Sequence, residues 1–134
     1  MEESLILETT FLIDLERELG KESEGPAQRF LLRHTSSRLY VTFTVAGEMA
    51  AGKSLAERET WLEFLQPFHV LPCTLGVCWE YGRLFRYLSR NGRLIGSNDL
   101  WIAATALANA IPVVTRNEKH FKRVPDLKVY SYSR

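Results

Sequence analysis

Four side chains carry the chemistry that this sequence suggests. Glu8, Glu48, Asp99 and Asn117 each stand where an apolar run ends or a helix is expected to begin. A carboxylate at the end of a buried element is costly to desolvate, so it is usually kept there for a counter-charge. Carboxylate and amide oxygens are the ligands that Mg²⁺ and Mn²⁺ prefer. If the four side chains converge, they predict a metal site suited to the hydrolysis of a phosphate ester.

Residues 47–54 offer a competing motif. The segment GEMAAGKS matches the P-loop pattern of nucleotide-binding proteins, after a candidate strand and before a helix. Its interior favours a helix, Glu48 would put a negative charge beside the phosphates, and no apolar strand ending in Asp is present to hold magnesium. The P-loop therefore stays the alternative interpretation.

Length and composition are those of one ordinary globular domain. The chain has 134 residues, of which 46% are hydrophobic and 25% charged, without visible repeats. The longest apolar stretch, residues 100–114, contains Asn109 and Pro112 and is shorter than the roughly 20 residues of a membrane span. The acidic N-terminus does not resemble a signal peptide. We therefore expect a cytoplasmic protein without membrane contact, in which Cys73 and Cys78 are reduced and buried.

Charge is distributed unevenly along the chain. Residues 1–78 carry 7 basic and 12 acidic side chains, whereas residues 79–134 carry 10 basic and 4 acidic ones. Such asymmetry indicates a polyanionic partner for the second half, although a dipolar surface without a partner gives the same pattern.

The apolar periodicity predicts alternating strands and helices. We expect strands near residues 4–7, 39–42, 68–71, 112–115 and 128–130, and helices near 10–19, 26–33, 46–65 with a break near Gly52, 75–89 and 98–110. Ser54 is the expected cap after the break, and Ser97 or Asn98 that of the last helix. The three tryptophans, Trp61, Trp79 and Trp101, are expected in the core.

This alternation predicts an α/β fold with a mostly parallel sheet of four to five strands and helices on both faces. In such sheets the functional crevice lies at the carboxyl ends of the strands. Glu8 and the segment 115–117 follow strands, and we expect Glu48 and Asp99 in the first turns of helices facing the same crevice. As helix-start residues, Glu48 and Asp99 have a purely structural explanation too, which Glu8 lacks.

Four segments in register carry a family resemblance. They are residues 7–14 (LETTFLID), 48–52 (EMAAG), 92–99 (GRLIGSND) followed by 102–106 (IAATA), and 114–117 (VTRN). The chain resembles PIN-domain proteins, specifically the VapC-like toxins of toxin–antitoxin pairs, over nearly its whole length. The resemblance implies one PIN-like domain over residues 1–134.

The resemblance also implies an activity, that of a divalent-metal-dependent endoribonuclease. Glu8, Glu48 and Asp99 would hold Mg²⁺ or Mn²⁺, and Asn117 would complete the catalytic set. Thr9 and Thr115 would orient water or the ligating carboxylates. VapC-like toxins form homodimers and bind a small antitoxin, which we expect as partners here.

The chain departs from the family pattern at two positions. Glu8 stands where the family usually has Asp, and its carboxylate reaches roughly 1.5 Å further, about one C–C bond. Asn117 replaces a fourth acid. A second alternative therefore remains, a catalytically weak PIN-like module that binds RNA or a protein.

Basic side chains suggest how RNA could be bound. Arg83, Arg86 and Arg90 recur along one helical face, Arg93 follows in the turn towards Asp99, and Arg116 precedes Asn117. Such rows can follow a phosphate backbone, although a solvated helix face has the same pattern. His69 with the two cysteines matches no zinc motif, and His120 is expected on a surface helix.

Overall fold

Five parallel strands form a single sheet in the order β3-β2-β1-β4-β5. The computed structural model describes residues 3–132, so the outermost residues of the expected domain 1–134 lie outside the described residues. The strands are β1 (Ser4–Leu7), β2 (Arg38–Thr42), β3 (His69–Leu71), β4 (Val113–Val114) and β5 (Val129–Tyr130). The predicted α/β fold with a parallel sheet is confirmed.

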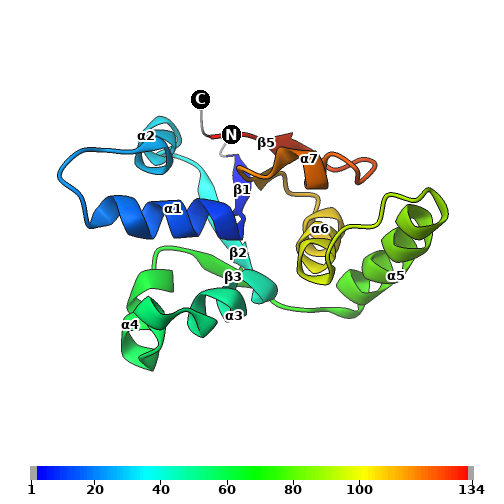
Figure 1. Ribbon diagram of the computed structural model, residues 1–134, viewed down its shortest axis with the longest axis horizontal. Helices are drawn as coiled ribbons and strands as arrows, with labels where there is room; N and C mark the ends of the chain where they lie inside the picture. Colours follow the sequence, from blue (N-terminus) through cyan, green and yellow to red (C-terminus); the bar gives the residue numbers. More distant parts are fainter. Residues whose placement is uncertain (1–2, 133–134) are drawn as a thin grey trace.

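Helices connect the strands and cover the sheet on both faces. They are α1 (Thr9–Leu19), α2 (Pro26–Arg33), α3 (Phe43–Ala51), the short 3-10 helix η1 (Lys53–Leu55), α4 (Arg58–Leu65), α5 (Leu75–Arg90), α6 (Ser97–Asn109) and α7 (Glu118–Phe121). Helices α1 and α2 lie on one side of the strands, and α6 with α5 packed along it lies on the other (Figure 1).

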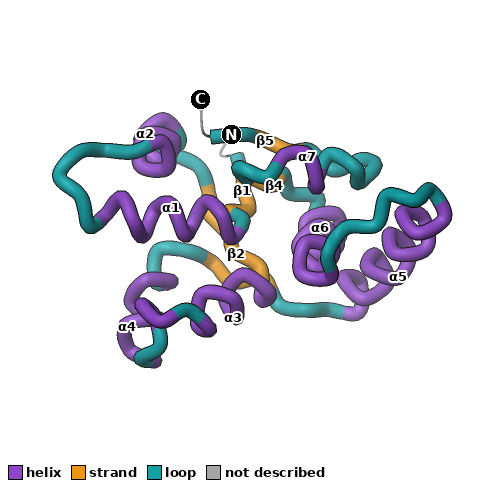
Figure 2. The backbone as a smooth tube through the Cα atoms, in the orientation of Figure 1, coloured by secondary structure: helices purple, strands orange, loops and turns teal. Residues whose placement is uncertain are grey.

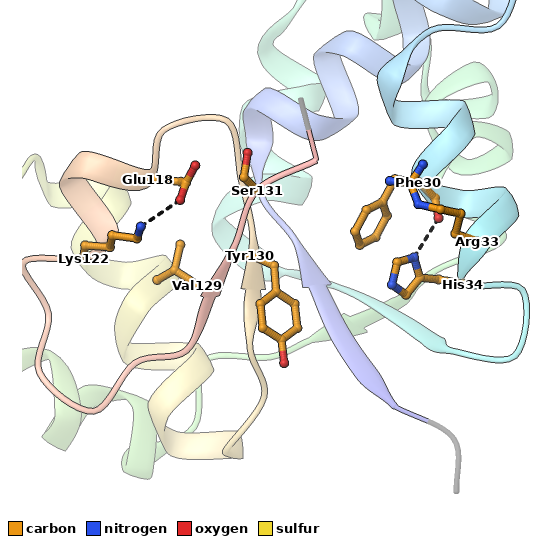
Figure 3. Close-up of a pocket in the computed structure, with 8 residues that line it drawn as sticks. All are labelled: Phe30, Arg33, His34, Glu118, Lys122, Val129, Tyr130 and Ser131. Carbon is orange, nitrogen blue, oxygen red and sulfur yellow. Dashed lines mark hydrogen bonds and ion pairs between the residues drawn. The ribbon is translucent and has the colours of Figure 1, made fainter. Parts of the chain in front are cut away.

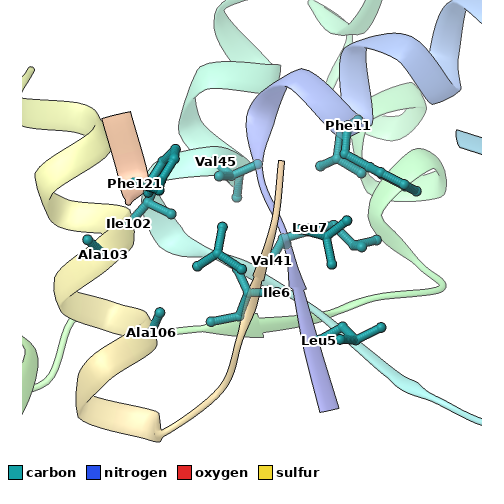
Figure 4. Packing of buried hydrophobic residues seen from close by; sticks show 14 of the residues in the cluster. Leu5, Ile6, Leu7, Phe11, Val41, Val45, Ile102, Ala103, Ala106 and Phe121 are labelled. Atoms are coloured by element: carbon teal, nitrogen blue, oxygen red, sulfur yellow. The ribbon is translucent and has the colours of Figure 1, made fainter. Parts of the chain in front are cut away.

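The central strand β1 explains the first apolar run of the sequence. It pairs with β2 through Leu5 and Leu39 and with β4 through Leu7 and Val114. A strand covered on both faces is apolar at consecutive positions, and residues 5–7 are fully buried. Alanines of α6 lie against this part of the sheet, where their small size lets the helix approach (Figure 4).

The order in which the chain adds strands to the sheet reverses between β1 and β4. The chain proceeds from β1 outwards through β2 to β3, then crosses to β4 on the other side of β1 (Figure 2). At such a switch point the connections leave in opposite directions and open a crevice at the carboxyl ends of the two strands. Glu8 directly follows β1 and Thr115 directly follows β4, so both lie at this point.

Some predicted helix starts and N-cap residues are wrong. Helix α3 begins at Phe43 rather than Ala46, since the Thr42 side chain accepts a hydrogen bond from the Val45 amide at 3.2 Å. Ser54 does not cap α4; its hydroxyl donates to Glu16 at 2.9 Å. The N-cap of α6 is Gly96, so neither Ser97 nor Asn98 has that role.

The P-loop interpretation is also wrong. Residues 47–51 belong to α3, and Lys53 and Ser54 lie in η1. A helix ties up the backbone amides that a phosphate-binding loop must leave free. The helix-forming residues between Gly47 and Gly52 therefore determine the local structure.

Two expectations about burial fail as well. Trp79 is 64% exposed, because only one side of α5 packs against α6, whereas Trp61 and Trp101 are partly buried. Cys73 and Cys78 are both exposed, so they are not core thiols.

Candidate active site

Glu8 is the buried acid at the switch point. Only 3% of the residue is exposed, although it carries a carboxylate directly after β1. Its Oε1 accepts hydrogen bonds from the hydroxyls of Thr10, at 2.7 Å, and Thr115, at 2.5 Å. Burial raises the pKa of Glu8, these hydrogen bonds lower it, and the nearby Asp99 charge raises it again, so the net shift is upwards.

The two threonines also order the loop after β4. Thr115 is fully buried and accepts a hydrogen bond from the Asn117 amide at 2.9 Å. Thr10 accepts one from the Arg116 amide at 3.0 Å. The backbone that carries Arg116 and Asn117 is therefore fixed by the same hydroxyls that hold Glu8. Thr115 was predicted to orient a ligating carboxylate, whereas Thr10 was not predicted to have a role.

Glu48 lies beside Thr9 rather than at a helix start. Helix α3 begins at Phe43, so Glu48 stands in its second turn and the prediction of a first-turn position is wrong. The Thr9 hydroxyl donates to Glu48 Oε1 at 2.8 Å. Because Glu48 is too far along α3 to interact with the helix N-terminus, the structural explanation through the helix dipole does not apply to it.

Asp99 lies in the first turn of α6, as predicted. Its Oδ2 is 3.2 Å from Nδ1 of His120, and the same nitrogen is 2.8 Å from Nδ2 of Asn117. His120 lies on α7 and is exposed, as expected, but no pattern in the sequence predicted its contacts with Asp99 and Asn117. Its position follows only from how α7 packs against α6.

Arg116 has its side chain held by Asp14, while its backbone amide bonds to Thr10 beside Glu8. Its Nη1 lies 2.9 Å from both carboxylate oxygens of Asp14, and the Tyr132 hydroxyl donates to Asp14 Oδ2 at 2.6 Å. Burial and the bond to Asp14 raise the pKa of Tyr132, so it remains a donor at neutral pH. Half of the Arg116 side chain is exposed. A fixed, accessible cation therefore stands at the edge of the crevice.

Two open cavities lie near these elements. One of about 500 Å³ runs between α1 and α3, with Thr9, Glu48 and Arg17 in its wall. The other, of about 460 Å³, lies between α2, α7 and β5 and is lined by Phe30, Arg33, His34, Glu118, Lys122, Val129, Tyr130 and Ser131 (Figure 3). Only the first contains predicted site residues.

Comparison with known proteins identifies this arrangement. The sequence profile of the PIN domain family matches residues 5–127. The chain belongs to the PIN-domain family. Ribonuclease VapC of Rickettsia bellii is 31% identical over 133 residues, which cover 93% of each chain, and Ribonuclease VapC1 of Rickettsia felis is 28% identical over 96% of each. The predicted resemblance is thus confirmed.

Solved structures share the PIN fold. VapBC-1 from nontypeable Haemophilus influenzae has a TM-score of 0.79 and 26% identity, covering 98% of this chain and 99% of the other. VapBC2 from Rickettsia felis, bound to a DNA fragment from its promoter, has a TM-score of 0.77 at 24% identity, covering 96% and 98%. The fold of the PIN domain is therefore common to both.

The acids of this PIN domain approach one another without forming a closed cage. Within residues 3–132, no three side chains of His, Cys, Asp or Glu are close enough to hold a metal ion as they stand. Glu8 is turned towards its two threonines, Glu48 towards Thr9, and Asp99 towards His120. The donor types fit a hard cation, and rotation of flexible side chains would be needed to bring three of them onto one ion.

The predicted arginines divide into two groups around this PIN domain. Arg116 adjoins Glu8, whereas Arg83, Arg86 and Arg90 lie on α5, which packs on α6 away from β1 (Figure 1). Arg83 pairs with Glu80 at 2.6 Å, and the Arg86 guanidinium lies 5.8 Å from the centre of the Trp79 ring. Arg93 is exposed in the turn before α6.

Across the part of the chain that the structure describes, no helix is long and apolar enough to cross a membrane.

Proposed function

We propose that this protein is a divalent-metal-dependent endoribonuclease and the toxin of a toxin–antitoxin pair. One observation carries the proposal: the Glu8 carboxylate is buried at the switch point of a PIN-domain sheet, where burial and the nearby Asp99 charge raise its pKa. The relatives named ribonucleases support the reaction class, and they cover nearly the whole chain.

Glu8, Glu48 and Asp99 are the proposed metal ligands, for Mg²⁺ or Mn²⁺. When bound, such an ion supplies positive charge for the phosphate and lowers the pKa of water. Glu8 is placed by β1, Glu48 by α3 and Asp99 by α6, so three separate elements contribute one carboxylate each. Metal ligands that are carried by helices and strands are held in position more precisely than ligands on loops.

The surrounding residues orient these ligands and the substrate. Thr9 holds Glu48, while Thr10 and Thr115 hold Glu8. His120 faces Asp99 and can position it, and the Asn117 amide group lies against the same ring nitrogen of His120. Partners of this kind typically change metal affinity or activity about 10–100-fold when removed.

Arg116 is the cation that we place on the substrate phosphate. Its contact with Asp14 fixes the guanidinium, and its exposed half can still donate to a phosphate oxygen at the crevice. Arg83, Arg86, Arg90 and Arg93 are proposed to bind RNA further from the scissile bond, because α5 is separated from β1 by α6. Single-stranded RNA is the proposed substrate, since its backbone can bend into a narrow crevice.

Two groups of exposed apolar side chains support the proposal that this protein binds protein partners. Leu75 and Trp79 on α5 are 88% and 64% exposed, and Leu19 and Leu32 at the ends of α1 and α2 are each 60% exposed. Exposed apolar patches on a small protein commonly mark protein interfaces. A second copy of the chain and a small antitoxin are the proposed partners, in the cytoplasm. Two solved structures that share this fold are described as toxin–antitoxin assemblies, one from Klebsiella pneumoniae and one from Mycobacterium tuberculosis.

A catalytically weak binding module remains the second candidate. The observation favouring it is that the three carboxylates do not close around one point in the described residues, together with the longer side chain of Glu8. Such a module would bind RNA through its arginines but would not cleave it.

Cleavage of labelled single-stranded RNA separates the two. The purified chain should cleave in millimolar Mn²⁺ or Mg²⁺ and stop in a chelator. The Lys53→Ala variant should cleave normally, because Lys53 is an exposed residue of η1. RNA binding with no cleavage under either ion would favour the binding module.

A further inference from the structure

Two cysteines meet at the beginning of α5. Their sulfurs are 3.7 Å apart and both residues are exposed. Neither belongs to the proposed catalytic centre, whose residues lie directly after β1, in α1, α3, α6 and α7, and in the loop after β4. The pair therefore needs its own explanation.

The helix start itself brings the two thiols together. Thr74 is the N-cap of α5, and its side chain accepts a hydrogen bond from the Val77 amide at 3.2 Å. Cys73 is consequently the residue before the cap, and Cys78 is the fourth residue of the helix. These are the two positions whose side chains pack together across a helix start, usually as an apolar pair. Here a pair of thiols occupies them.

This placement is compatible with a covalent bond. A disulfide has an S–S length of about 2.05 Å, so the sulfurs would need to close by roughly 1.7 Å, which side-chain rotation can share between them. Gly76, between the two cysteines, has no side chain to obstruct an approaching reagent, and Leu75 is almost fully exposed. Both sulfurs are therefore accessible from solvent.

We propose that Cys73 and Cys78 form a reversible intramolecular disulfide, with a low-molecular-weight disulfide such as oxidised glutathione as the oxidant. One cysteine thiolate attacks a glutathione sulfur, forms a mixed disulfide and releases one glutathione thiolate. The second cysteine thiolate then attacks the protein sulfur of that mixed disulfide and releases the other glutathione. Two protein thiols are oxidised, one glutathione disulfide is reduced to two thiols, and the two protons pass to the released thiolates.

The bond would fix the start of α5 to the segment leaving β3. That segment is the short connection, residues 72–74, between the edge strand β3 and the outer helix α5 (Figure 1). It would also constrain the exposed residues Leu75, which lies between the two cysteines in the sequence, and Trp79, which follows Cys78. The thiol state would thereby act on this apolar surface without touching Glu8 or Asp99.

Equilibration of the full chain in glutathione redox buffers tests the proposal. Free thiols are trapped by alkylation and counted by mass spectrometry. We expect the wild-type thiol count to fall from two to zero in one step, with the loss of two hydrogen atoms and no retained glutathione. The Cys73→Ser and Cys78→Ser variants should each stop at the glutathione adduct, because the resolving thiol is missing.

Three outcomes would overturn it. They are retained glutathione on the wild-type chain, a disulfide between two chains in place of the internal one, and two thiols that stay free where the single variants are modified. The serine variants should fold normally, because the residue that caps α5, Thr74, is unchanged. The melting temperature of the oxidised wild type should exceed that of the reduced form, whereas the two serine variants should show no such increase.

Discussion

Two glutamates are buried within residues 3–132, and their surroundings differ. Glu18, at the end of α1, is 8% exposed, and its two carboxylate oxygens accept hydrogen bonds from the backbone amides of Ala27 and Gln28 at 3.0 and 2.9 Å. Glu8 is 3% exposed and has its Oε1 bonded by two hydroxyls. One acid is bound by fixed backbone donors and the other by side chains that can rotate.

This difference makes Glu18 a structural acid and leaves Glu8 available to bind a cation. The amides facing Glu18 are the otherwise unpaired N–H groups at the start of α2, so this carboxylate caps the helix from another element. The hydroxyls facing Glu8 can turn to donate elsewhere, and the neighbouring Asp99 adds like charge. A cation can therefore replace the threonine hydrogen bonds of Glu8 at small cost, whereas displacing Glu18 leaves two backbone amides at the start of α2 without their acceptors.

The largest expected effect is on activity at Glu8. Glu8→Gln keeps the shape and an acceptor for the threonine hydroxyls but removes the charge, so RNA cleavage should fall about 1,000-fold. Glu18→Gln is the matched control and should keep activity within about 3-fold wherever the protein is folded. Equal losses in both variants, measured by initial cleavage rates, would erase the distinction between the two acids.

A large effect on stability is expected when the Glu18 carboxylate is displaced from the start of α2. A Cβ at Gly25 would lie 2.2 Å from Cδ of Glu18, so Gly25→Ala must displace the capping carboxylate. We expect a loss of about 1–3 kcal/mol in the free energy of unfolding, measured with urea. Gly47→Ala is the control, because nothing lies within 4 Å of the added Cβ and the position is helical. An unchanged Gly25→Ala protein would show that Glu18 is not needed as a cap.

A smaller effect should appear in the pH dependence of stability. The folded-state pKa of Glu8 is raised above the ordinary value of 4.5, mainly by burial. Between these two values the native state binds more protons than the unfolded state, so Glu8 stabilises the protein less as pH rises. In metal-free buffer, Glu8→Gln should therefore gain on the order of 1 kcal/mol over wild type at pH 7 and nothing below about pH 4. A gain that is independent of pH would contradict the raised pKa.

The sequence predicted the fold because its signals are local. The apolar run 5–7, the helix-forming segments and the closing segment 112–117 each specify their element, and alternation of strand and helix specifies a parallel sheet. It also placed Glu8, Asp99 and Thr115 at one edge, since those residues directly follow a strand or begin a helix.

Contacts between distant elements could not be predicted in this way. The Asp14–Arg116 pair, the Arg116 amide on the Thr10 hydroxyl, and His120 beside Asp99 depend on how α1, the loop after β4, α6 and α7 pack. The exposure of Trp79 depends on which side of α5 meets α6, which apolar periodicity alone does not decide. The cap at Thr42 was missed because a threonine at a strand end also suits the strand.

RNA cleavage by Asp99→Asn tests the central claim most directly. Asparagine keeps the volume of Asp99 and suits a helix start about equally well, so a purely structural role predicts an unchanged enzyme. The metal-site account predicts that cleavage falls at least about 100-fold while the melting temperature in metal-free buffer is unchanged or raised, because repulsion with Glu8 is removed. Stabilisation by millimolar Mn²⁺ should disappear in the same variant and persist in Glu18→Gln. Full cleavage by Asp99→Asn would contradict the account.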